Sequence, residues 1–296
     1  WMRLPPVQVN INESTSVTTN LFVGAKEVNT IKSYQKSLDI ENFMDSVDWG
    51  WFFYLTKPIF FLLDWFNSFT HNMGWSIILL TLFIKTLLFP LSYKSFVSMS
   101  RMKHLQPQME KIKKNAGDDR AKLQQELMAL YKKEKVNPVA GCLPILLQIP
   151  VFFSLYKVLF VTIEMRHAPF IGWIKDLSAP DPTSYMNLFG LLPFSPPDPT
   201  SLFSILSIGV YPILMGVTMW LQQKLNPSPT DKTQAMIFAW MPWVFMFMLG
   251  QFSAGLVIYW VANNLIQFGQ QYIIMYSQGV KPDIFGNILK SFKKSE

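Results

Sequence analysis

Residues 75–89 read Trp-Ser-Ile-Ile-Leu-Leu-Thr-Leu-Phe-Ile-Lys-Thr-Leu-Leu-Phe, an apolar run with a single charge at Lys85. A charge near the middle of a membrane-spanning helix costs about 2.5–3.5 kcal/mol on insertion scales. Lys85 lies about ten residues into the run, roughly 15 Å along a helix, which is too deep for its ammonium group to snorkel to the interface. The run therefore predicts a spanning helix whose cation faces a wet cavity between helices.

The composition places the whole chain in the membrane class. Half of the residues are hydrophobic and only 15% are charged, which is typical of an all-α polytopic membrane protein. The lone cysteine, Cys142, and three scattered histidines offer neither a disulfide framework nor a cluster of metal ligands. No catalytic constellation or phosphate-binding loop is present in the sequence, so we expect no catalytic residue, no metal site, no cofactor and no enzymatic activity.

The charges are distributed unevenly along the chain. Eleven Lys/Arg and five Asp/Glu lie between Lys94 and Lys135, whereas two Lys/Arg and four Asp/Glu lie between Thr162 and Thr200. By the positive-inside rule the first segment is cytoplasmic and the second faces outward. The basic tail, residues 281–296, is expected to be cytoplasmic as well.

Hydropathy divides the chain into four parts. Residues 1–50 are polar, contain a β-like stretch at 16–23, and are read as the C-terminal remnant of an outside domain. Residues 51–73 form an amphipathic helix expected to lie in the membrane interface. Residues 74–280 form the core and precede the tail. The spans expected in the core are about 75–93, 139–163, 202–222, 235–250 and 254–276.

The segment between the first two spans has helical periodicity of its own. Apolar residues recur three and four apart on both sides of Asn115-Ala-Gly-Asp-Asp119. Gly117 can adopt the left-handed conformation that ends a helix, and Asp118 or Asp119 can cap the next one. Residues 100–135 are therefore expected to form a cytoplasmic helical hairpin with an apolar seam.

Two of the later spans carry polar side chains. Gln148 lies between two prolines in the second span, and Asn263, Gln267 and Gln270 share one face of the last span by their spacing. These side chains either hydrogen-bond helix to helix within the bundle or line the same cavity as Lys85. Read from their residue types alone, Tyr259 and Trp260 are packing aromatics.

Several ordered motifs resemble the YidC-type membrane protein insertase family. They are Gly74-Trp-Ser-Ile-Ile through Phe89-Pro-Leu-Ser, Met102 to Gln108, Glu126 through Asn137-Pro138, Gly141-Cys-Leu-Pro-Ile-Leu-Leu-Gln-Ile-Pro-Val-Phe152, Ala168 to Ser178, and Ser253-Ala-Gly-Leu-Val-Ile-Tyr-Trp260. The resemblance runs from about residue 48 to residue 280. Residues 1–47 resemble the end of the periplasmic β-domain of Gram-negative members, which implies a first membrane helix and most of that domain upstream.

The resemblance implies a five-helix core around a hydrophilic groove that receives substrates. On this basis the groove residues are Lys85, Gln148, Trp260, Asn263 and Gln267. The family usually places Arg where Lys85 stands, so this chain keeps the charge but lacks the planar fork of a guanidinium group.

The same resemblance implies a function and a location. The chain is expected to insert and fold nascent integral membrane proteins in the bacterial inner membrane, alone or with a Sec translocon, and with no small-molecule substrate. The lipid bilayer and the ribosome are further expected partners. Two other classes stay open from the residues alone: a transporter or channel for an anionic solute, and an assembly scaffold without insertase activity.

Overall fold

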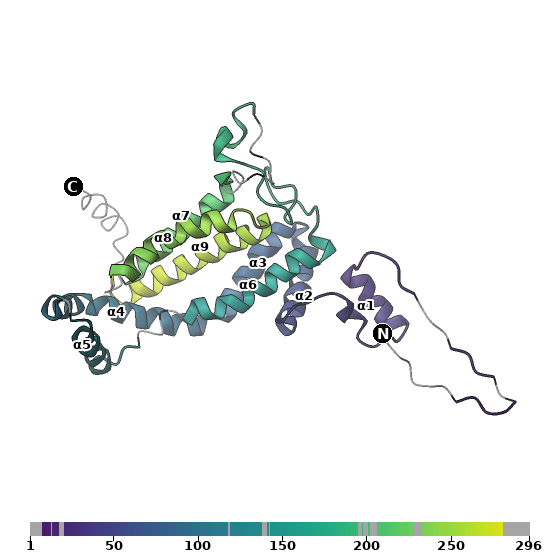
Figure 1. Ribbon diagram of the computed structural model, residues 1–296, viewed down its shortest axis with the longest axis horizontal. Helices are drawn as coiled ribbons and strands as arrows, with labels where there is room; N and C mark the ends of the chain where they lie inside the picture. The colour runs from purple at the N-terminus through teal and green to yellow at the C-terminus, as the bar shows by residue number, and fades with distance from the viewer. Residues whose placement is uncertain are drawn as a thin grey trace.

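The computed structural model describes residues 8–12, 14–17, 21–117, 119–137, 141, 143–194, 197, 201, 206–227 and 232–280. Within these ranges the chain is helical and contains no β-strand (Figure 1), so the all-α prediction is confirmed. Cys142, Asp118, the basic tail and the first residues of the predicted spans at 139 and 202 lie outside the described residues. The α-helices are α1 (Val28–Ser37), α2 (Phe53–Thr70), α3 (Met73–Leu87), α4 (Phe89–Ala116), α5 (Arg120–Lys133), α6 (Leu143–Val161), α7 (Val210–Leu225), α8 (Lys232–Leu249) and α9 (Ala254–Ser277), with short 3-10 turns η1 (Phe43–Ser46), η3 (Ile163–Met165) and η4 (Tyr185–Gly190).

The first predicted span does not continue straight to residue 93. Helix α3 ends at Leu87 and α4 begins at Phe89, with an angle of 68° between them. Pro90 lies in the first turn of α4, where its missing N–H is tolerated, but its ring would clash inside a continuous helix. Beyond the bend α4 runs without a break to Ala116. The expected division between a span and a separate hairpin helix near residue 100 was therefore wrong.

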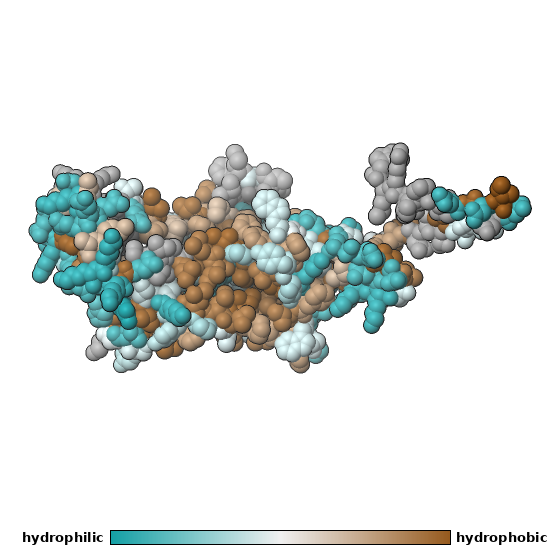
Figure 2. Space-filling model, turned by 90° about the horizontal axis from the view of Figure 1, so that it is seen from below, coloured by the Kyte–Doolittle hydropathy of each residue, from teal (hydrophilic) through white to brown (hydrophobic). Residues whose placement is uncertain are grey.

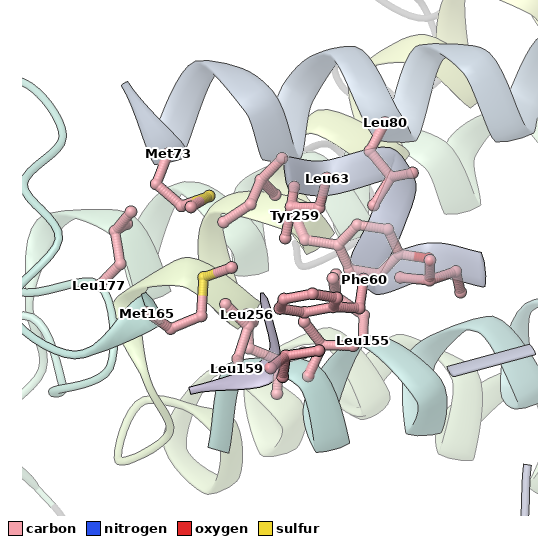
Figure 3. Packing of buried hydrophobic residues seen from close by; sticks show 14 of the residues in the cluster. Phe60, Leu63, Met73, Leu80, Leu155, Leu159, Met165, Leu177, Leu256 and Tyr259 are labelled. Carbon is pink, nitrogen blue, oxygen red and sulfur yellow. The ribbon is translucent and has the colours of Figure 1, made fainter. Parts of the chain in front are cut away.

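The central core lies where α2, α3, α6 and α9 meet. Figure 3 shows the rings of Phe60 and Tyr259 between Leu80 on α3 and Leu155 on α6. All four side chains are buried. Helix α2, predicted to be an amphipathic helix in the membrane interface, contributes one face to this core.

Helices α7, α8 and α9 form a second packed layer beside this core (Figure 1). Met215 of α7 and Val257 of α9 lie in its buried cluster. Gly216 of α7 lies so close to Met246 of α8 that an added Cβ would stand 3.0 Å from the Met246 sulfur. The absence of a Cβ at Gly216 therefore allows α7 and α8 to approach this closely.

The far part of α4 folds back onto α5 as a helical hairpin. The predicted apolar stripes meet in one cluster that is separate from the bundle core, made of Met102, Leu105, Met109, Leu127, Leu130 and Val136 with Ile112, Leu123 and Tyr131 beside it. At the tip Gly117 has φ +55°, and the Asp119 carboxylate accepts the Lys122 amide at 3.0 Å. The Asp119 cap is as predicted, whereas Gly117 has the positive φ expected of it but a ψ of −122°, outside the left-handed helical region that was expected.

The N-terminal segment packs against the bundle through α1. Val28 and Ile31 are buried, and the Val28 amide donates to Glu164 Oε1 at 2.9 Å. Residues 16–17 and 21–23, within the stretch expected to be β-like, are described without regular secondary structure.

The surface is apolar around the middle of the molecule and hydrophilic towards both ends. Figure 2 shows the apolar band between the hydrophilic α4–α5 hairpin on the left and the N-terminal region on the right. Among the described helices none is both long and apolar enough to cross a membrane alone; α3 and α4 meet that condition only as a bent pair, and Leu146–Val161 and Thr233–Leu249 are shorter apolar helices.

Candidate functional site

The Lys85 ammonium group lies between two glutamine side chains from different helices. Its Nζ donates to Gln267 Oε1 of α9 at 2.8 Å and to Gln148 Oε1 of α6 at 3.4 Å. Only 6% of the residue is exposed. The structure therefore brings together three of the five predicted groove residues, and it meets the cation with amide oxygens.

Each of these side chains is placed by its helix. Lys85 lies one turn before the α3–α4 bend, on the face of α3 that also buries Thr81. Gln148 lies two residues before Pro150, which has no N–H to donate within α6 and whose ring favours a local kink. Gln267 lies in the middle of α9. The three helices thus converge on the cation from three directions.

The charge of Lys85 has no carboxylate partner in the described part of the chain. The ion pairs found there join Lys57 to Asp45, Lys157 to Asp48, and His167 to Asp176. Two amide dipoles neutralise a buried cation only in part, and a buried charge is stable only when paired or solvated. The site therefore favours binding of an anionic group.

The polar residues of α9 divide over two faces. Asn264 donates to Thr218 Oγ1 at 3.2 Å, and Gln271 bonds Gln222 and Asn226, so this face joins α9 to α7. The other face carries Gln267 toward Lys85. Asn264 and Gln271 lie outside the stripe predicted at Asn263, Gln267 and Gln270, so their bonds to α7 leave the two alternatives for that stripe open.

Asn263 lies on the Lys85 side of α9 by its spacing from Gln267, but its oxygen is not among the acceptors of Lys85. Asn263 is buried, and its Oδ1 accepts no hydrogen bond from the described residues. Gln270 Oε1 is likewise buried and accepts no hydrogen bond from the described residues. Buried polar atoms without partners are rare in folded proteins, and they cluster where a ligand or water is accommodated.

Tyr259 belongs to the site, although the sequence reading assigned it to packing. The Gln148 amide nitrogen donates to the Tyr259 hydroxyl, which orients the glutamine oxygen towards Lys85. Spacing gave no signal for this, because at about 100° per residue Trp260 lies nearer to the direction of Gln267 than Tyr259 does. Trp260 packs edge-on against Phe152 of α6, with ring centroids 5.0 Å apart, and takes no part in the hydrogen bonds described around Lys85.

One loop, residues 168–184, closes the end of the bundle opposite the hairpin. It supplies acceptors to the first amides of α9, with Leu177 O 2.9 Å from Gly255 N, and to α7, with Asp181 Oδ2 2.9 Å from Tyr211 N. It also packs on α3, where a Cβ at Gly74 would stand 2.0 Å from the Phe170 ring. The free N–H groups of helix starts are thereby satisfied at one common end.

Two carboxyl groups near this loop have shifted pKa values. Partial burial raises the pKa of Asp176, but hydrogen bonds from Ser178 and the His167 amide outweigh it, and the net pKa lies below the usual value. Burial raises the pKa of Glu164, which accepts the first amide of α1. Asp176 is therefore an anchor of the loop in its ionised form.

Known proteins resemble this chain along almost its whole length. A sequence profile described as "60Kd inner membrane protein" matches residues 65–281, and one described as "YidC periplasmic domain" matches residues 1–62. A relative from Roseobacter denitrificans named "Membrane protein insertase YidC" is 67% identical over 291 residues, covering 98% of this chain and 48% of its own length. A relative of the same name from Dinoroseobacter shibae is 65% identical over 294 residues, covering 99% and 48%.

A solved structure shares the fold. It is described as "Active YidC insertase crystal structure with the first transmembrane domain resolved", with a TM-score of 0.59, 25% identity, and coverage of 84% of this chain and 54% of that one. The chain spans about half the length of the curated relatives that it matches. The profile match covers well over half of these 296 residues, so the resemblance seen in the motifs is confirmed, and the chain belongs to the YidC family of 60Kd inner membrane proteins.

Proposed function

We propose that this chain inserts and folds nascent integral membrane proteins, using Lys85 as the charge that receives their polar, acidic segments. The observation that supports this is a buried cation with amide partners and no carboxylate among the described residues. Membership of a family whose relatives are named membrane protein insertases gives the class of client.

The physical problem that such a protein solves is the passage of a polar tail through hydrocarbon. Each backbone group left without a hydrogen bond there costs several kcal/mol. Polar side chains from α3, α6 and α9 shorten the apolar path, and Lys85 attracts an acidic tail to mid-depth. The apolar segment of the client then moves into lipid, and burial of its surface drives the step. No covalent chemistry or cofactor is required.

The residues that hold the cation would exchange partners during this step. In the structure the Gln267 and Gln148 oxygens are the hydrogen-bond acceptors of the ammonium group. A client carboxylate replaces these neutral acceptors with a charged one, so that both partners of the new hydrogen bond are ionised and the buried charge is paired. The glutamine amide groups can then turn towards the client backbone. Asn263, with its unpartnered oxygen, is the next acceptor along the same face of α9.

The orientation that we propose puts the hairpin, residues 100–135, and the C-terminus in the cytosol and the loop 168–184 outside. The positive-inside rule supports it, because the hairpin is basic and the loop is not. The hairpin then meets nascent chains first, with the ribosome and a Sec translocon as proposed partners. Cysteines placed at exposed Lys122 or Lys175 in a Cys142→Ser background test this with an impermeant maleimide: only the second should be labelled from the periplasmic side.

The decisive experiment is insertion of a short single-span client with an acidic tail into liposomes, scored by protease protection of the tail. The vesicles carry this chain, its Lys85→Ala variant, its Lys85→Arg variant, or no protein. The matched control is Lys94→Ala, which removes an exposed lysine beyond the α3–α4 bend. We expect protection with the unchanged chain, Lys85→Arg and Lys94→Ala, and a loss of about tenfold with Lys85→Ala.

Two results would redirect the proposal. Equal protection with Lys85→Ala across acidic-tailed clients removes the electrostatic role of Lys85. Flux of a small anion through vesicles without any client, together with no protection above empty vesicles, favours a transporter or channel instead.

Deletion of the hairpin tests its receiving role. Residues Phe96 and Met99 of α4 pack on Ile274 of α9, so a deletion of residues 100–135 leaves this contact in place. We expect the deletion to lower insertion while the bundle still unfolds cooperatively. Normal insertion after deletion would contradict a receiving role.

A further inference from the structure

A cavity of about 270 Å³ lies between the segment before α2 and the outer half of α6. Its lining includes Asp48, Trp51 and Phe52 from the segment, and Phe153, Tyr156 and Lys157 from α6. It contains none of the residues around Lys85. Its volume falls just below the range of about 300–1,000 Å³ that drug-sized ligands occupy, so it suits a smaller polar group.

The cavity carries one charge of each sign at its rim. The Lys157 ammonium group lies 2.5 Å from Asp48 Oδ2, and Asp48 Oδ1 accepts the Gly50 amide at 3.0 Å. The ammonium and the amide lower the pKa of Asp48, so the carboxyl is ionised at neutral pH. Gly50 has φ +74°, and a Cβ there would stand 2.9 Å from Lys157 Cε. The backbone is therefore shaped to let the lysine stem lie against it.

Aromatic rings make up the rest of the lining. Phe52 and Phe153 stack with an interplanar angle of 18°, and they bring the segment and α6 together. Trp51 is 95% exposed, and Phe53 and Tyr54 next to it are exposed as well. Exposed aromatic side chains beside a charged pair are typical of the level of lipid headgroups in a membrane protein.

The cavity also lies at the edge of the apolar surface. Helix α2 and the C-terminal end of α6 lie at the right-hand end of the bundle, beside α1 (Figure 1). At that end the apolar band of Figure 2 gives way to hydrophilic residues. Phe160, one turn beyond Lys157 on α6, is exposed. An acyl chain leaving the cavity would therefore find an apolar surface next to it.

We propose that this cavity binds the headgroup of a zwitterionic phospholipid with a primary ammonium group, the phosphatidylethanolamine class. Lys157 takes the phosphate, and Asp48 with the faces of the surrounding rings takes the ammonium. The Lys157–Asp48 pair is weak because it is exposed. On binding it is exchanged for two pairs, Lys157 with the lipid phosphate and Asp48 with the lipid ammonium, so no charge is left without a partner. The bound lipid joins the N-terminal segment to α6.

The charge arrangement distinguishes this class from an anionic lipid. A phosphatidylglycerol headgroup also offers a phosphate to Lys157, but it has no cation for Asp48 or for the rings. Its phosphate would leave Asp48 unpaired next to a second negative group. The cavity is therefore expected to prefer the zwitterion, which the opposite charges at its rim match.

The test is lipid retention by the purified 296-residue chain in non-ionic detergent, counted by native mass spectrometry. Equal amounts of phosphatidylethanolamine and phosphatidylglycerol are supplied, and soluble phosphoethanolamine is the competitor. We expect phosphatidylethanolamine to be retained preferentially and to be displaced by the competitor. Asp48→Asn is expected to weaken retention of phosphatidylethanolamine alone, by about tenfold, the loss carried by one charge-assisted hydrogen bond. Lys157→Gln is expected to weaken retention of both lipids.

The chain offers a matched control. Lys57 and Asp45 form an ion pair of the same length and similar exposure, near the cavity but outside its lining. The double variant Asp45→Asn/Lys57→Gln should retain phosphatidylethanolamine normally. Equal loss in this control and in Asp48→Asn/Lys157→Gln, or equal retention of the two lipids, would overturn the proposal. The measurement needs no client protein, so its outcome is independent of the proposed insertase activity.

Discussion

Replacing the polar cluster around Lys85 with apolar residues should stabilise the bundle and abolish insertion. The change is Lys85→Met, Gln148→Leu, Gln267→Leu and Tyr259→Phe together, hereafter the apolar variant. It removes the buried cation, both of its acceptors and the hydroxyl that orients one of them. Because the donor and both acceptors are removed together, no buried polar atom of the cluster is left without its partner.

The expected magnitude follows from these contacts. Burial of the cation costs about 2.5–3.5 kcal/mol, and the two hydrogen bonds that offset it have a charged donor and contribute about 1.5–3 kcal/mol each in net terms at good geometry, so the two terms nearly cancel. Apolar side chains of similar volume in place of a buried charged cluster are typically neutral or stabilising by about 1–4 kcal/mol, so the apolar variant is expected to gain about 1 kcal/mol. Lys85→Met alone leaves two glutamine oxygens without a donor, at about 1–3 kcal/mol each, so it is expected to be no more stable than the unchanged chain.

The assay is unfolding in mixed micelles with increasing sodium dodecyl sulfate, followed by circular dichroism, in parallel with the liposome insertion assay. The expected order of stability is apolar variant first, then the unchanged chain, with Lys85→Met equal or below. Only the unchanged chain should insert an acidic-tailed client. An apolar variant less stable than the unchanged chain would refute the reasoning, because the cluster would then serve to hold the helices together.

Three further outcomes are expected. Gly74→Val places branched carbon atoms where Phe170 lies, and it should lower the unfolding midpoint in the same titration, whereas Gly172→Ala, with open space around it but φ +63°, should cost only about 1 kcal/mol. Leu127→Ala should destabilise the hairpin by about 2–3 kcal/mol and speed its cleavage by trypsin without moving the bundle midpoint, since its cluster is separate; a shifted bundle midpoint would contradict that separation. The pKa of Asp176 lies below its unfolded value, so its contribution to stability is present above about pH 4 and is lost as the pH falls further. Asp176→Asn should therefore lower stability at pH 7 and remove this part of the acid dependence. The measurement is the unfolding midpoint from pH 6 to pH 3.

The parts of the fold that the sequence predicts well are those determined by residues close together in the chain. The hairpin stripes are set by spacings of three and four, and its tip by a glycine that takes positive φ and an aspartate that caps the next helix. The contact between Lys85 and the glutamines is less local, since 63 and 182 residues separate the partners. From the residues alone it stayed one of two alternatives, because a buried charge requires polar neighbours but the same side chains could also join helix to helix; the family resemblance named the group.

The remaining errors come from packing that no local pattern reveals. The direction of the chain after Leu88 depends on how α4 packs against α6 and α9. The sequence shows only Pro90, which is compatible with a bend and equally with the start of a new helix. Trp260 and Tyr259 are neighbours of similar chemistry, and the rotation of about 100° between successive residues gives them different partners: the Tyr259 hydroxyl accepts from Gln148, and the Trp260 ring packs on Phe152. That rotation is fixed by the two layers on either side of α9.

The bend at Leu88 has a mechanical consequence. Helix α4 continues for 28 residues beyond it, about 42 Å, and Lys85 lies only three residues before it. Phe96 and Met99 pack on Ile274 of α9, so α4 tilts most freely beyond Met99. A tilt of about 5° there moves the far end of α4, about 25 Å away, by about 2 Å and leaves Lys85 in place. The hairpin can therefore move while the charge keeps its position.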